Sequence, residues 1–61
     1  MVDVKLLRVK ADHMTQTELS KKSGVNRTTI SAVENGHQPS VRVAVKLARI
    51  LGIDWREFYE P

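Results

Sequence analysis

One stretch, Gln16–Gly36, constrains the fold more than any other part of the chain. It reads QTELSKKSGVNRTTISAVENG and predicts a helix, a tight turn and a second helix. Thr15 lies just before it and Glu18 three residues after Thr15, which is the capping-box pattern of a helix start. Gly24 can adopt the positive φ that ends a helix, and Asn26 can cap the next helix. We therefore expect two short helices joined by a turn at this glycine.

The second of these helices, expected over Arg27–Glu34, has an apolar and a polar side. At about 100° per residue, Ile30 and Val33 fall together on one side. The other side carries small or polar groups and one guanidinium, from Arg27, Thr28, Ser31 and Ala32. A helix anchored at its back and polar at its front suits insertion into the major groove of DNA. An ordinary helical hairpin with a solvated face has the same pattern, so spacing alone leaves both interpretations open.

The length of 61 residues corresponds to one domain, 1–61. Such a chain buries only about 60% of its unfolded surface, so we expect modest stability. The absence of cysteine excludes disulfides and thiolate metal sites. With no secretory signal and no apolar run of about 18 residues, the chain is expected to be cytoplasmic and free of membrane contact. The formal net charge of +3 mildly favours a polyanionic partner.

Outside this stretch, the sequence predicts three further helices. The first is expected over 1–12, because its apolar residues recur at helical spacing. The next is expected over 41–51, where Ser40 serves as the cap. A short last helix is expected over 55–59, after a second capping box. The predicted fold class is therefore all-α with five helices.

Short motifs occur along the chain in a definite order. They are Leu7-Arg8, Met14-Thr15-Gln16, Glu18-Leu19, Ser23-Gly24-Val25, Ile30-Ser31, Glu34-Asn35-Gly36, Pro39-Ser40 and Leu51-Gly52-Ile53. The ordered set resembles the phage-repressor/Cro-like helix-turn-helix family, the XRE type of bacterial transcriptional regulators. The resemblance implies a five-helix, lambda-repressor-like DNA-binding domain.

Two departures from the family pattern fall in expected loops. The segment between the first two helices has one residue more than the family, at Asp12-His13. The segment from Gly36 to Pro39 has one residue fewer. Both departures concern loop contacts rather than the fold.

The resemblance also implies which residues contact DNA. It places Arg27 and Thr28 where the family touches base edges, and Ala32 at a later base-facing position. Arg27 is expected to bind O6 and N7 of guanine; the alternative is a phosphate contact alone. Other contacts, mainly to phosphates, are expected from Gln16, Asn26, Ser31, Asn35, His37, Gln38 and Arg42. In the family, the residue at Gln16 also braces a side chain of the recognition helix.

Two further sets of residues have expected structural roles. By resemblance, Arg8 pairs with Glu34 and fixes the recognition helix against the first helix. The three aromatic residues, Trp55, Phe58 and Tyr59, are expected in the core and at a homodimer contact. Neither histidine has acidic or cysteine neighbours at ligand spacing, so we expect no metal, no cofactor and no catalytic residue.

Together these features predict a sequence-specific regulator of transcription that binds double-stranded DNA. We expect a repressor of the phage or mobile-element kind, acting as a homodimer with helix 27–34 in the major groove. Its expected location is the bacterial cytoplasm, and the nucleoid when bound. Two alternatives remain open: an antitoxin-type regulator with a protein partner, and a protein-interaction module that no longer binds DNA. An enzyme is not expected.

Overall fold

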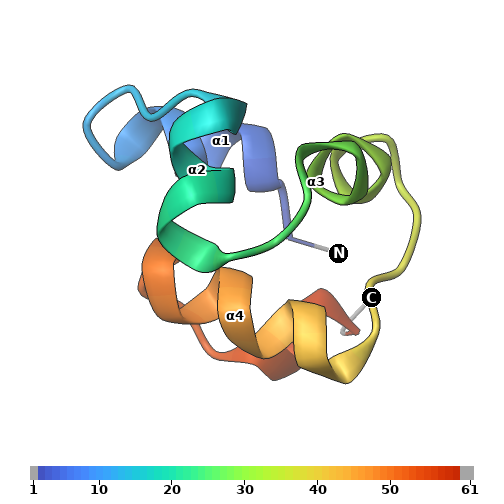
Figure 1. Cartoon of the computed structure of the whole chain (residues 1–61). Coiled ribbons are helices and arrows are strands. Elements are labelled where there is room, and N and C mark those ends of the chain that lie inside the picture. Colours follow the sequence, from blue (N-terminus) through green and yellow to red (C-terminus); the bar gives the residue numbers. More distant parts are fainter. Residues whose placement is uncertain (1, 60–61) are drawn as a thin grey trace.

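The computed structural model describes residues 2–59, and all regular elements in that range are helical (Figure 1). They are α1 (Val4–Lys10), α2 (Gln16–Ser23), α3 (Arg27–Glu34), α4 (Val41–Leu51) and the 3-10 helix η1 (Trp55–Phe58). Helix α3 contacts α1 and α2, whereas α4 contacts α2 and η1. Helix α2 therefore joins the two halves of the molecule.

Caps explain why the helix–turn–helix forms where the sequence predicts it. Thr15 Oγ1 accepts from the backbone amide of Glu18 at 3.1 Å, and the Glu18 carboxylate accepts from the Thr15 amide at 3.3 Å. Gly24 then ends α2 with a φ of 75°, in the left-handed region that a glycine adopts without strain. Asn26 Oδ1 accepts from the Thr28 amide at 2.8 Å and starts α3. The predicted bounds of α2 and α3 are confirmed.

The first helix is shorter than the predicted range 1–12, whose first residue lies outside the described part of the chain. It begins at Val4, because the Asp3 side chain accepts a hydrogen bond from the backbone amide of Leu6 at 3.1 Å. It cannot extend to the predicted end, because Asp12 and His13 have φ angles of 63° and 53°. These left-handed residues turn the chain toward α2.

The last element also differs from the prediction, since 55–59 is not an α-helix. The structure has a 3-10 helix, η1, so the described residues form four α-helices and one 3-10 helix rather than five α-helices. The predicted capping box is present, with the Glu57 carboxylate accepting from the Asp54 amide at 2.9 Å. Hydrogen bonds from Arg56 lower the pKa of Asp54 to about 2.

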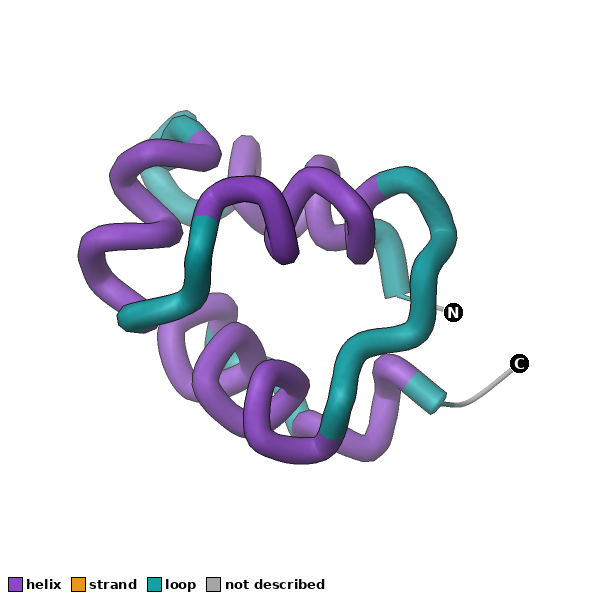
Figure 2. The backbone as a smooth tube through the Cα atoms, turned by 45° about the vertical axis from the view of Figure 1, so that its right-hand side comes forward, coloured by secondary structure: helices purple, strands orange, loops and turns teal. Residues whose placement is uncertain are grey.

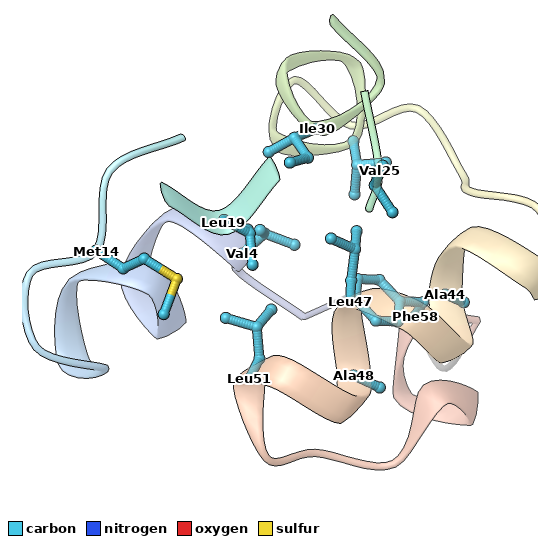
Figure 3. Packing of buried hydrophobic residues seen from close by; sticks show 11 residues of the cluster. Val4, Met14, Leu19, Val25, Ile30, Ala44, Leu47, Ala48, Leu51 and Phe58 are labelled. Atoms are coloured by element: carbon cyan, nitrogen blue, oxygen red, sulfur yellow. The ribbon is translucent and has the colours of Figure 1, made fainter. Parts of the chain in front are cut away.

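The core lies between α4 on one side and α1, α2 and α3 on the other. Its buried apolar side chains are Val4, Met14, Leu19, Val25, Ile30, Val33, Ala44, Leu47, Ala48, Leu51 and Phe58. Leu47 of α4 points toward Val25 and Ile30 (Figure 3). Phe58 is only 1% exposed. Phe58 therefore lies in the core, as one part of its prediction states, and its ring is covered by its own chain rather than presented to a second copy.

Candidate nucleic-acid interface

Helix α3 presents the face that the sequence pattern predicts. Ile30 is fully buried and Val33 is 5% exposed, so the back of the helix is held in the core. Arg27 and Thr28, in the first turn, are exposed. Among the described residues, Arg27 takes part in no ion pair. Its guanidinium carries five N–H donors in a planar fork, which suit a phosphate or a base edge.

A hollow lies where the start of α2 meets the exposed side of α3. It is lined by Gln16, Arg27, Thr28 and Ser31. These side chains offer an amide, a guanidinium and two hydroxyls, which are donors and acceptors suited to phosphate oxygens and base edges. Two helices thus supply one polar surface, which we call the α2–α3 surface.

A hydrogen-bonded network supports this surface from behind. Arg8 Nε donates to Glu34 Oε2 at 3.0 Å, and Arg8 Nη2 donates to Glu34 Oε1 at 3.3 Å. The third donor group, Nη1, reaches the carbonyl of Met14 at 2.9 Å. The two charged side chains are only 13% and 9% exposed. Arg8 therefore ties α1 to the end of α3 and to the segment before α2, and the expected ion pair is present.

Gln16 belongs to the same network. Its Nε2 donates at 3.1 Å to Glu34 Oε1, the oxygen that also accepts from Arg8. One hydrogen of Nε2 is used in this bond, while the second hydrogen and the carbonyl oxygen remain available to a ligand. The family resemblance implied that Gln16 braces the recognition helix, but it did not identify Glu34 as the partner. No local spacing links these residues, which lie 18 positions apart.

Other predicted contact residues follow the opposite end of α3 in the chain, and none of them lines the hollow at Gln16 and Arg27. Asn35, His37 and Gln38 are exposed in the loop between α3 and α4, and Arg42 is exposed in the first turn of α4. The structure therefore does not bring all the candidates into one cluster.

Two predicted residues of the α2–α3 region are less available than the others. The Asn26 side chain is engaged in capping α3. Ala32 is partly buried and offers only a methyl group. Of the two remaining dimer candidates, Trp55 and Tyr59 are both partly exposed, and their rings meet edge to face with centroids 6.0 Å apart.

Within residues 2–59, no three His, Asp or Glu side chains lie close enough together to hold a metal ion. No helix in the same range has the length and apolar character needed to cross a membrane.

A capped helix–turn–helix with a buried back and an exposed polar front on its second helix defines a DNA-binding domain of the helix-turn-helix class. The comparison with known families agrees, because the model described as "Helix-turn-helix" matches residues 4–58. The chain belongs to this family, the phage-repressor and Cro-like (XRE-type) DNA-binding regulators of transcription.

Relatives in two archaea and in a phage support this assignment. The chain is 40% identical over 48 residues to an uncharacterized HTH-type transcriptional regulator of Methanocaldococcus jannaschii, covering 77% of this chain and 73% of that protein. It is 55% identical over 38 residues to an uncharacterized HTH-type transcriptional regulator of Archaeoglobus fulgidus, covering 61% of this chain and 54% of that protein. It is 37% identical over 46 residues to the ImmF control region 10 kDa protein of Bacillus phage phi105, covering 74% of this chain and 51% of that protein. The chain thus spans about half the length of the last two relatives, and no solved structure matches it.

Proposed function

We propose that the chain is a sequence-specific transcriptional regulator that binds double-stranded DNA as a homodimer, with α3 in the major groove. One observation carries this proposal: Arg27 and Thr28 are exposed on α3, while Ile30 and Val33 hold its other side in the core. The exposed side is thus free to meet base edges, and the buried side fixes its orientation.

Phosphate contacts are proposed at both ends of α3. Gln16 lies in the first turn of α2, where backbone amides also point toward an approaching anion. Asn35, His37 and Gln38 follow the other end directly, and Arg42 lies further along the chain, in the first turn of α4. Contacts at both ends fix the position and tilt of the helix in the groove, so that Arg27 meets a particular base pair.

The short length of α3, the proposed recognition helix, favours binding as a homodimer. Helix α3 has eight residues, and a helix of this length reaches only a few base pairs. Two copies on a two-fold operator double the contacts, with half-sites about 34 Å apart, which is one helical turn. Similarity to the ImmF control region protein of a phage supports a repressor of the phage or mobile-element kind.

The test is selection of binding sites from random duplex DNA, followed by competition at moderate salt. The Arg27→Ala variant is expected to lose about 1–3 kcal/mol at one base pair of the selected site and to lose preference there. The matched control is Arg49→Ala, which removes the same charge from an exposed position on α4 and should leave base preference unchanged.

One result would contradict the base contact proposed for Arg27, and a second would contradict DNA binding as a whole. An equal loss on every sequence with Arg27→Ala would make Arg27 a phosphate contact and leave the base contacts to other residues. Folded wild-type protein that binds no duplex at low salt would remove DNA binding altogether.

A further inference from the structure

The loop between α3 and α4, which we call the α3–α4 loop, is tied to α3 by backbone hydrogen bonds only in its first half. It runs along the outside of the molecule from the end of α3 to the start of α4 (Figure 2). The Gly36 amide donates to the Val33 carbonyl at 3.1 Å, and the His37 amide donates to the Ala32 carbonyl at 3.0 Å. These bonds tie the loop to the helix it leaves. The second half contains Pro39, which has no amide hydrogen to donate.

One side chain from outside the loop holds its second half. Tyr59 Oη donates to the carbonyl of Pro39 at 2.7 Å, across 20 positions of sequence. Within residues 2–59, the described side-chain hydrogen bonds include no other that reaches positions 36–39. Pro39 is buried, so its carbonyl would have little access to water if the tyrosine bond were lost.

Tyr59 is well placed to act as an anchor. Its amide donates to the Arg56 carbonyl at 3.0 Å, which continues the turn of η1. Its ring meets Trp55 edge to face, and η1 packs on α4. The hydroxyl therefore comes from a fixed part of the molecule, on the side of the core away from α3.

From this geometry we infer that Tyr59 is a positioning residue for DNA binding, whose hydroxyl fixes the α3–α4 loop against the phosphate backbone. The inference rests on the proposed function. The loop carries His37 and Gln38, and Pro39 is followed directly by Ser40, the cap of α4. Holding the Pro39 carbonyl sets where the exposed loop side chains meet a phosphate. Tyr59 itself is not required to touch DNA.

The test variant is Tyr59→Phe, which removes one oxygen and keeps the ring against Trp55. Because the buried Pro39 carbonyl loses its donor, we expect the midpoint of thermal unfolding to fall by several degrees, so binding is compared at a temperature where both proteins are fully folded. Affinity for the selected duplex should fall about three- to tenfold, the cost of ordering the loop on binding. Because a weaker dimer would also lower affinity, the dimerisation constant is measured without DNA by sedimentation.

The decisive readout is a duplex in which single phosphates are replaced by neutral methylphosphonates. With wild-type protein, replacement should weaken binding both at phosphates facing the α3–α4 loop and at those facing Gln16. With Tyr59→Phe, the penalty at the loop phosphates should shrink, while the penalty facing Gln16 stays. The matched variant Gln16→Ala should give the reverse pattern.

Identical phosphate patterns for wild-type and Tyr59→Phe would overturn the inference and leave the proposed function intact. A uniform drop in affinity with an unchanged pattern would overturn it too, because that result indicates a defect of the dimer or of the fold. Wild-type protein that binds no duplex would overturn the proposed function and this inference with it.

Discussion

At the residue scale, Glu34 links a residue that stabilises the fold, Arg8, to a residue of the candidate interface, Gln16. One carboxylate accepts two donors from Arg8 and one from Gln16. The ion pair cancels a negative charge that would otherwise repel a phosphate near Gln16. The same pair holds the end of α3 against α1. A pair of this kind contributes more to a defined arrangement than to net stability.

Removing one member of the pair should therefore cost more than removing both. Arg8→Met leaves a nearly buried carboxylate with only the Gln16 amide as its partner, and should lower the free energy of unfolding by about 3 kcal/mol. The double variant Arg8→Met/Glu34→Leu should recover most of this loss. Urea unfolding of the two variants checks the prediction, and equal stability of wild-type and Arg8→Met would contradict it.

Some of these side-chain contacts could be predicted from the sequence, and others could not. The Arg8–Glu34 pair followed from the family pattern. The bonds from Gln16 to Glu34 and from Tyr59 to Pro39 did not, because they join helices and loops through the packing of the whole chain. Pairs of this kind leave no repeat or spacing in the sequence.

At the element scale, the helices that the sequence predicted well are those with strong caps. Helices α2, α3 and α4 begin after Thr15, Asn26 and Ser40, whose side chains accept the first free amides. The first helix was predicted too long because Asp12 and His13 have ordinary side chains for a helix but left-handed backbones. Aspartate and histidine are among the residues that tolerate this conformation, yet their presence does not require it.

The turn between α2 and α3 gives a direct test of this logic. Gly24 has a φ of 75°, and a Cβ added there would meet nothing within 4 Å. Gly24→Ala should therefore cost only the backbone penalty of a left-handed residue, about 1 kcal/mol of unfolding free energy. Gly24→Asn should cost less, because asparagine tolerates this region. Denaturant unfolding compares the two variants, and a larger cost for asparagine than for alanine would contradict the explanation.

At the scale of the whole molecule, the candidate contacts with DNA come from two halves. Gln16 and Arg27 lie on the half formed by α1, α2 and α3, while Arg42 lies on the half formed by α4 and η1. The packing of α2 on α4 and the α3–α4 loop connect these halves. The distance between the two sets of contacts therefore depends on the packing of the core, which makes a rigid fold part of the proposed recognition.

The same division predicts how binding responds to salt. Each phosphate neutralised by a cationic side chain contributes about −0.9 to the slope of log K against log salt concentration. Arg42, exposed in the first turn of α4 next to the α3–α4 loop, is placed to neutralise one. Arg42→Gln should reduce the magnitude of the slope by about one for each subunit and weaken binding to all DNA sequences alike.

The control variant Arg49→Gln removes the same charge further along α4 and should leave the slope unchanged. Titrations of the selected duplex between about 50 and 200 mM salt measure both slopes. Equal reductions with the two variants would mean that only net charge matters, and that Arg42 meets no particular phosphate.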